Sequence, residues 1–139
     1  MDSTQPTEYY PHKLLLFGGF IFLGLLLLLN ELANRYSVYA LYLWFDTPMH
    51  FVGGFGVGVV AIGLLRSWFA KERYHTTPQF WYTVFLVVAV GVVWELVEAY
   101  YKVSVMFGGL FWFDTIKDLL MDTFGGILSY ICFHPRISK

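Results

Sequence analysis

The sequence predicts an all-α, polytopic membrane protein: four transmembrane helices in a compact bundle that forms one domain over residues 1–139. Of its 139 residues, 58% are hydrophobic and 14% are charged, whereas soluble domains carry about 25% charged and about 45–50% apolar residues. Four apolar segments approach the length of about 20 residues that a membrane span needs. Helix-capping residues and prolines lie near their ends, as expected for separate helices.

The first predicted span covers residues 13–32 and contains the leucine run from Leu25 to Leu29. It could be mistaken for a signal peptide, but the preceding stretch carries the acids Asp2 and Glu8. No small-x-small cleavage pattern follows the apolar run. We expect this segment to remain as an uncleaved membrane anchor.

The second predicted span covers residues 48–66, and Asp46 or Thr47 can cap its first turn. Pro48 is tolerated there because the first helical N–H groups have no partner within the helix. Residues 32–45 mix polar and aromatic side chains, and form either a short interfacial helix or an extension of the first span.

The third and fourth predicted spans cover residues 80–101 and 115–133. Pro78 precedes the third span and Pro135 follows the fourth, positions at which proline starts or stops helices.

The distribution of Lys and Arg predicts that both termini are cytoplasmic, since cytoplasmic loops are enriched in these residues. With the termini inside, the cytoplasmic side holds Lys13, Arg66, Lys71, Arg73, Arg136 and Lys139, and the other side holds Arg35, Lys102 and Lys117.

The most informative polar feature is a stripe of three aspartates, Asp114, Asp118 and Asp122. Residues four apart share one helix face, where like charges repel. Inside a bilayer each carboxylate also loses hydration, so ionisable residues there indicate function. Such a stripe needs protons, basic partners or a bound cation to neutralise it.

Alternating helix direction brings further polar groups to the same, outer end of the bundle. The second span begins there and the third ends there, while the fourth begins there. We therefore predict an outward-facing acidic pocket formed by Asp46, His50, Glu95, Glu98, Asp114, Asp118 and Asp122.

Within this pocket, the predicted metal ligands are His50, Glu95, Asp118 and Asp122, and the predicted catalytic groups are Asp46, His50 and Glu98. Imidazole with carboxylates suits Mn or Zn, whereas shells made only of oxygen suit Mg. The expected cofactor is therefore a divalent ion: Mg, Mn or Zn. Arg35, Lys102 or Lys117 would help to attract a phosphate group.

Simpler roles remain open for several of these residues. Glu98 can pair with Lys102 one turn later, and Asp114 can cap its helix or pair with Lys117. His50 can be a core histidine that donates to a carbonyl. Glycines on the same helix faces are expected to serve close helix packing.

Three classes of function remain open: a metal-dependent protein acting on or binding a lipid, a proton or cation relay or transporter, and an accessory subunit of a larger membrane complex. A membrane protein partner or a homo-oligomer fits the third class. The net charge of −1 provides no basic footprint for nucleic acid. The sequence contains no HExxH, G-x-S-x-G or CxxC motif.

Three motifs, one in each of the last three predicted helices, carry a resemblance to a known group of proteins. They are Asp46-Thr-Pro-Met-His50-Phe51, then Trp94-Glu95-Leu-Val-Glu98, then Asp114-Thr-Ile-Lys-Asp118-Leu-Leu-Met-Asp122-Thr-Phe-Gly125. In this order they resemble small polytopic proteins of the VanZ-like and YjdF-like type. VanZ-like proteins usually have Gln near Glu98 and Asn near Asp122, so the acids found here bring the chain nearer to the YjdF-like pattern.

The VanZ resemblance implies an association with low-level resistance to the glycopeptide teicoplanin, without a settled biochemical activity. We expect a multi-pass protein of the plasma (inner) membrane of a prokaryote. Its pocket is expected to bind a divalent cation together with an anionic membrane lipid or polyprenyl-phosphate headgroup, with hydrolysis or transfer of phosphoryl groups as the enzymatic form of this hypothesis.

Overall fold

The computed structural model describes residues 12–68, 76–101 and 111–133. Several sequence predictions fall outside these ranges: the cytoplasmic placement of Lys71, Arg73, Arg136 and Lys139, the pairing of Lys102, and the stop at Pro135.

The described residues form helices, apart from Tyr36, Ser37 and Tyr42 between them. In chain order these are α1 (His12–Arg35), α2 (Val38–Leu41), η1 (Leu43–Phe45), α3 (Asp46–Trp68), α4 (Thr76–Tyr101) and α5 (Phe111–Phe133). No strand occurs in these ranges, which confirms the all-α class. Each of the four apolar segments predicted from the sequence lies within one long helix.

Three of the described helices are long and apolar enough to cross a membrane: residues 12–35, 43–68 and 78–100. They support a membrane protein. The first half of α5 carries Asp114, Lys117, Asp118 and Asp122, and the predicted count of four spans is not confirmed.

The connection between α1 and α3 contains both an extension of the first helix and short helices, the two alternatives that the sequence allowed, and the interfacial position stays a prediction. α1 continues to Arg35, and Ser37 then takes a left-handed conformation with φ of 56°. The short helices α2 and η1 follow. The Tyr39 hydroxyl donates a hydrogen bond to Asn30 Oδ1, which ties α2 back to α1.

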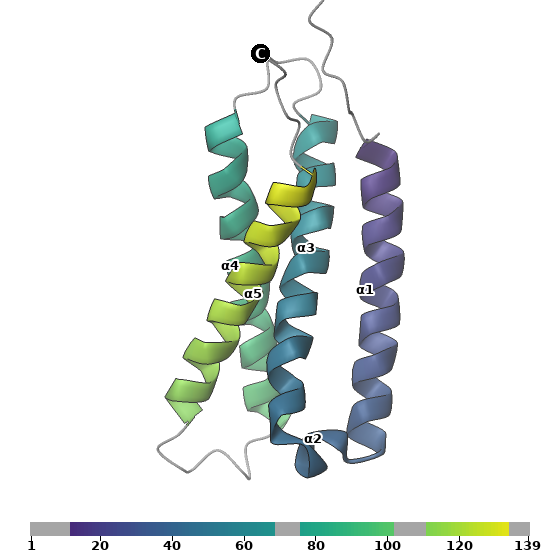
Figure 1. The fold of residues 1–139 in the computed structure, drawn as a ribbon, viewed down its shortest axis with the longest axis vertical. Coiled ribbons are helices and arrows are strands. Elements are labelled where there is room, and N and C mark those ends of the chain that lie inside the picture. The colour runs from purple at the N-terminus through teal and green to yellow at the C-terminus, as the bar shows by residue number, and fades with distance from the viewer. Residues whose placement is uncertain (1–11, 69–75, 102–110, 134–139) are drawn as a thin grey trace, which may run out of the picture.

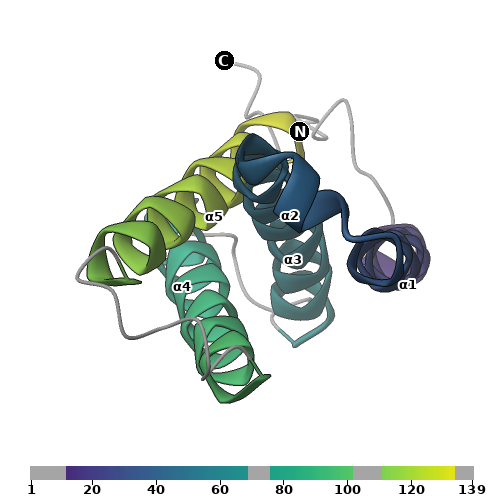
Figure 2. The same cartoon turned by 90° about the horizontal axis from the view of Figure 1, so that it is seen from below.

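α3 lies between α1 on one side and the pair α4 and α5 on the other (Figures 1 and 2). α1 begins and α5 ends at the same end of the bundle, the upper end in Figure 1. The start of α3, the end of α4 and the start of α5 therefore lie together at the lower end. This arrangement brings segments from three helices to one site.

Glycines allow α3 and α5 to approach closely, as the sequence predicted. A Cβ atom added at Gly54 would overlap the backbone of Asp122, and one at Gly125 would overlap the backbone of Phe51. Small residues at such crossings drive helix association in membranes, where the hydrophobic effect between helices is weak.

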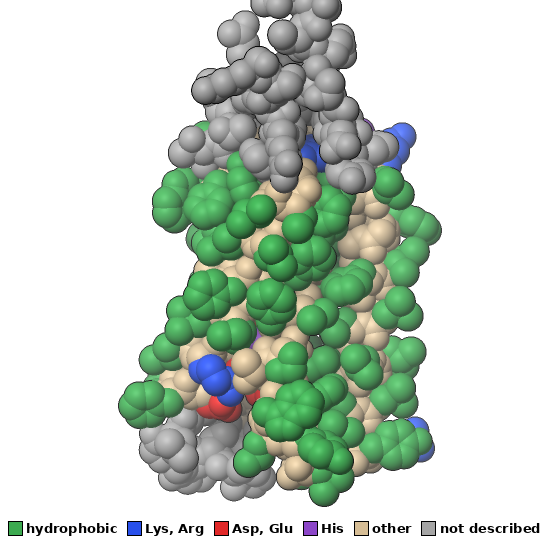
Figure 3. All heavy atoms as spheres, in the orientation of Figure 1, with side chains coloured by type: hydrophobic (Ala, Val, Ile, Leu, Met, Phe, Trp, Pro, Cys, Tyr) green, Lys and Arg blue, Asp and Glu red, His purple; other side chains and the backbone are tan. Residues whose placement is uncertain are grey.

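The outer surface is mostly apolar, as expected for a lipid-facing protein. Figure 3 shows hydrophobic side chains over most of one face, with charged groups toward its ends. α1 contributes strongly, because only Leu15, Gly19 and Ala33 are buried among its residues. Leu25 and Leu28 are 62% and 56% exposed.

At the upper end lies Arg66, the last residue of the second predicted span and one of the basic residues counted for the cytoplasmic side. It lies within α3 and is 1% exposed. Its guanidinium donates a hydrogen bond to the carbonyl of Phe133 at the end of α5. Helix ends leave such carbonyls without helical partners, and a cation there also suits the helix dipole. Arg66 therefore joins α3 to α5.

Candidate functional site

His50, on the second turn of α3, is the centre of a cluster of carboxylates. Its Nδ1 atom lies 3.3 Å from Asp122 Oδ2. Its Nε2 atom lies 3.8 Å from Asp46 Oδ1, 3.8 Å from Glu95 Oε1 and 4.0 Å from Asp118 Oδ2. The structure thus brings together one imidazole and four carboxylates from α3, α4 and α5.

The cluster is buried, and several of its polar atoms lack hydrogen bonds. His50 is 5% exposed, Glu95 8%, Asp118 2% and Asp122 6%. Within the described ranges, His50 Nε2, Glu95 Oε1 and Asp118 Oδ1 have no hydrogen-bond partner. Buried polar atoms are normally hydrogen-bonded, and burying a charge without compensation is costly. His50 Nε2 and Glu95 Oε1, which lie 3.8 Å apart, are therefore candidates for binding a ligand, whereas Asp118 Oδ1 lies 3.4 Å from the charged Nζ of Lys117.

Glu95 is positioned by a residue that the sequence analysis did not single out. Thr115 Oγ1 donates a 2.9 Å hydrogen bond to Glu95 Oε2, while Glu95 Oε1 points toward His50. Thr115 precedes Asp118 by three residues, so the two share one face of α5. That spacing is the sequence signal which could have identified it.

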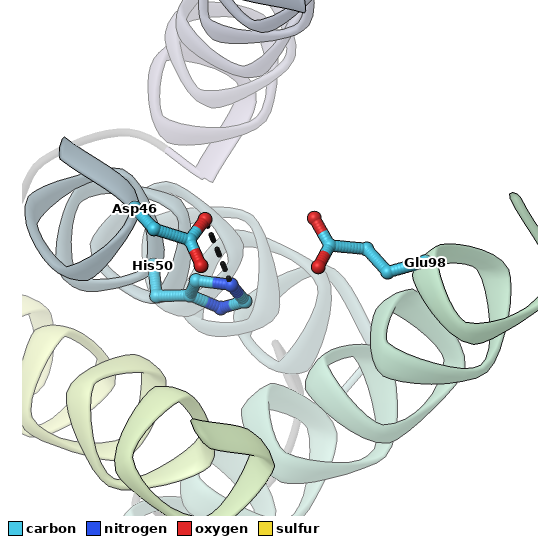
Figure 4. A group of neighbouring side chains, drawn as sticks. All are labelled: Asp46, His50 and Glu98. Carbon is cyan, nitrogen blue, oxygen red and sulfur yellow. Dashed lines mark ion pairs between the residues drawn. The ribbon is translucent and has the colours of Figure 1, made fainter. Parts of the chain in front are cut away.

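Glu98 approaches the cluster from the cavity side. Figure 4 shows its carboxylate pointing from α4 toward Asp46 and His50 on α3. Trp94 Nε1 donates a 3.2 Å hydrogen bond to Glu98 Oε1. The alternative partner expected from the sequence, Lys102, lies outside the described residues.

Three overlapping groups of side chains have the composition and spacing to hold a metal ion, with one ligand atom from each residue within 4.8 Å of the others. They are Asp46, His50 and Glu98; His50, Glu95 and Asp118; and Asp46, Asp114 and Asp118. All three members of the second group are buried.

Lys117 compensates part of the negative charge at the rim. Its Nζ atom lies 2.6 Å from Asp114 Oδ1 and 3.4 Å from Asp118 Oδ1. The first contact confirms the pairing of Asp114 with Lys117 that the sequence allowed. Arg35, the other predicted phosphate-attracting residue that the structure describes, is exposed at the end of α1.

A cavity of about 220 Å³ adjoins the cluster between α1, α3 and α4. Its polar lining comprises Asn30, Tyr39, Asp46, His50, Glu98 and Asp122. Much of the remaining lining is aliphatic: Leu23, Leu26, Leu27, Val57, Val87 and Val90. The cavity is therefore polar at the end where the cluster lies and apolar further into the bundle.

Tyr39 occupies the polar end of this cavity, outside the three candidate spans. Burial raises the pKa of its phenol above the ordinary value of 10, and the carboxylates of Asp46 and Glu98 raise it further. Tyr39 therefore stays protonated and keeps its hydroxyl donated to Asn30 Oδ1, which also lines the cavity.

This geometry defines a class of protein: an all-helical membrane protein with a buried cluster of acids around one histidine. Residues 12–139 match the family described as "Predicted membrane protein (DUF2238)", and the chain belongs to this family. No curated protein and no solved structure matches the chain. The family description supports a membrane location.

Proposed function

We propose that this chain is a VanZ/YjdF-like protein with four transmembrane helices, whose acid–histidine cluster binds a divalent cation and the phosphate of a lipid headgroup. The membrane is the plasma (inner) membrane of a prokaryote, both termini are cytoplasmic, and the cluster faces outward. The observation that carries this proposal is the buried pair of His50 Nε2 and Glu95 Oε1, which lie 3.8 Å apart and have no hydrogen-bond partner among the described residues.

The exposed face of α5 supports its role as the fourth span. Side chains at three- and four-residue spacing on this face are large, apolar and 39–55% exposed: Ile116, Leu120, Phe124, Leu128 and Ile131. The acids Asp118 and Asp122 point the other way and are buried. A helix with apolar residues facing outward and acids facing the bundle interior is the arrangement found for functional charges in membranes.

The spacing of the cluster supports a shared cation better than direct hydrogen bonds. The distances of 3.8–4.0 Å from His50 Nε2 to its three carboxylate neighbours exceed the usual range of about 2.7–3.2 Å for hydrogen bonds. Ligands bound to one ion at about 2.1–2.4 Å lie roughly 3.0–3.9 Å from each other. Small side-chain movements would therefore bring His50, Glu95 and Asp118 into ligand positions.

Asp122, which the sequence predicted as a fourth metal ligand, instead approaches the other ring nitrogen of His50. Its contact with His50 Nδ1 orients the imidazole, because a histidine that binds a metal normally has its second nitrogen held by a carboxylate or carbonyl. In this role Asp122 leaves Nε2 directed toward Glu95 and Asp118. The mixture of one imidazole and several carboxylates suits Mn or Zn, and a more oxygen-rich subset suits Mg.

In the enzymatic form of the proposal, a divalent ion here would polarise phosphoryl oxygens or activate water. Asp46 and Glu98 line the cavity next to His50, so either carboxylate can accept a proton from a nucleophile as general base. Lys117, at the rim beside Asp114, would attract the phosphate. A purely binding role uses the same residues without proton transfer.

The alternative of a proton or cation relay finds less support further along the bundle. The buried hydroxyl of Ser129 donates to the carbonyl of Gly126, and that of Thr83 donates to the carbonyl of Gln79. These hydroxyls are engaged with their own helices. We therefore favour the metal site, and the relay and the accessory subunit remain as outcomes of its test.

Elemental analysis of the purified protein tests the proposal, comparing wild type with Asp118→Asn and Asp122→Asn. We expect a stoichiometric divalent metal in wild type and its loss in both variants. Glu31→Gln, which removes an exposed acid on α1, is the matched control and should retain the metal. A metal-free wild type with protonated acids would support the relay instead, and a co-purifying partner without either property would support the accessory subunit.

A further inference from the structure

We propose that the cavity between α1, α3 and α4 holds one hydrocarbon chain of a membrane phospholipid, with its headgroup at the acid–histidine cluster. This inference deepens the proposed function and rests on it for the headgroup. Three features of the cavity indicate a lipid chain: its lining residues, its depth along the helices, and its position between α1 and α4.

The lining changes from polar to apolar along the cavity. Asp46 and Glu98 stand at one end, whereas Leu23, Val57 and Val87 line the other. An amphipathic ligand can place its charged group at the first end and bury apolar surface at the second. A small hydrophilic solute would leave the aliphatic part without a matching group.

The depth of the cavity matches one leaflet of a bilayer. Its lining on α3 runs from Asp46 to Val57, and its lining on α4 runs from Val87 to Glu98. Each stretch rises about 16 Å, and half of a hydrocarbon core of about 30 Å is about 15 Å. A chain belonging to the outer leaflet therefore fits beside a headgroup at the cluster.

The cavity is also placed for entry from the side. α1 packs on α3 and α2, whereas α4 packs on α3 and α5. In the described part of the chain, the two walls α1 and α4 thus belong to helices that do not pack extensively on each other. A lipid chain can enter between them from the bilayer, without crossing the headgroup region.

Gly53 keeps the cavity open beside the cluster. A Cβ atom there would lie 3.7 Å from Leu26 Cδ2 and 3.9 Å from Asp122 Oδ1, which is ordinary contact. Its neighbour Gly54 differs, because a Cβ there would overlap the backbone of α5. Helix packing accounts for Gly54 but does not require glycine at position 53, where a large side chain would fill the space that the lipid chain needs.

The test uses phosphatidylglycerol with a photoactivatable diazirine on its acyl chain, incorporated into lipid nanodiscs with the full-length protein. In wild type we expect crosslinks to the cavity residues Leu26, Val57 and Val87, and also to the outward-facing Leu25 and Leu28. The last two report ordinary lipid contact and serve as an internal control.

Gly53→Leu should abolish the cavity crosslinks and leave those at Leu25 and Leu28, while the matched Gly53→Ala should retain both sets. Val57→Phe fills the same space from the next turn of α3. If Gly53→Leu does not fold, Val57→Phe should show the same loss of the cavity crosslinks. Crosslinks confined to the outer face of wild-type α1, or cavity crosslinks that persist in a folded filling variant, would overturn the inference.

Metal content measured on the same samples separates this inference from the proposed function. Cavity crosslinks in a protein without metal would leave the chain site in place and remove the metal proposal. Bound metal without cavity crosslinks would keep the metal proposal and remove the lipid-chain site.

Discussion

Replacing Asp118 with Asn should have opposite effects on the metal-free and the metal-loaded protein. Asp118 has ligand atoms within 4.8 Å of those of Glu95, Asp46 and Asp114, and solvent screens the repulsion from Asp114 because its side chain is 61% exposed. At an effective dielectric constant of about 20, two like charges at that distance repel by about 3.5 kcal/mol. Asn has nearly the same shape as Asp without the charge, so the substitution removes the two main repulsions, from Glu95 and from Asp46.

The substitution also removes attractions, and their loss offsets part of the expected increase in the stability of the metal-free protein. A charged His50 at 4.0 Å attracts Asp118 by about 4 kcal/mol on the same scale. The pair with Lys117, whose side chain is 38% exposed, contributes at most about 1 kcal/mol because solvent screens it. The net expectation is that metal-free Asp118→Asn is more stable than metal-free wild type by about 2 kcal/mol.

The metal-loaded protein should show the reverse order. A cation present at about 100 times its dissociation constant stabilises the wild type by about 2.7 kcal/mol. Asp118→Asn should gain little, since it lacks one of the charged ligands. Differential scanning fluorimetry in detergent, with EDTA and with added Mn²⁺, measures both melting temperatures.

Glu31→Gln is the matched control for this experiment. Glu31 is an exposed acid on α1, away from the cluster, so the loss of its charge should leave both melting temperatures close to those of wild type. The reasoning is wrong if Asp118→Asn lowers the melting temperature of the metal-free protein, or if it keeps the full stabilisation by Mn²⁺.

Three further predictions follow from particular contacts. Gly54→Ala should lower the melting temperature sharply, because overpacking typically costs about 1–3 kcal/mol and the clash is with backbone, whereas Gly24→Ala has nothing within 4 Å and should match wild type. Thr115→Val should weaken Mn²⁺ binding about 10- to 100-fold in a titration, because Glu95 loses its hydrogen bond, and unchanged affinity would reject this positioning role. Arg66→Met should destabilise the protein by about 1.5–3 kcal/mol while its metal content stays the same, and loss of metal would show that the two ends of the bundle are coupled.

The helical segments could be predicted from the sequence because the apolar runs are long and end at polar residues or prolines. The convergence of the acids also followed from alternating helix direction, which places the start of α3, the end of α4 and the start of α5 together. His50, Glu95 and Asp118 meet within 4.8 Å in the structure. Their roles as ligands or catalytic groups remain predictions.

Other features depend on packing that one sequence does not reveal. Arg66 ends the second predicted span, and nothing in the sequence indicates its burial, but α3 continues to Trp68 and Arg66 is buried against the end of α5. The cavity depends on how far α1 stands from α4, which no periodicity encodes. The contrast between Gly53 and its neighbour also required the position of α5, because adjacent glycines in a helix face different neighbours.

The most direct test of the account is pulsed electron paramagnetic resonance of the Mn²⁺-loaded protein in nanodiscs. The account predicts electron spin echo modulation from one directly coordinated imidazole nitrogen, and loss of that modulation in His50→Gln. Mn²⁺ that binds without nitrogen modulation, or with modulation that persists in His50→Gln, would contradict a metal centre built around His50.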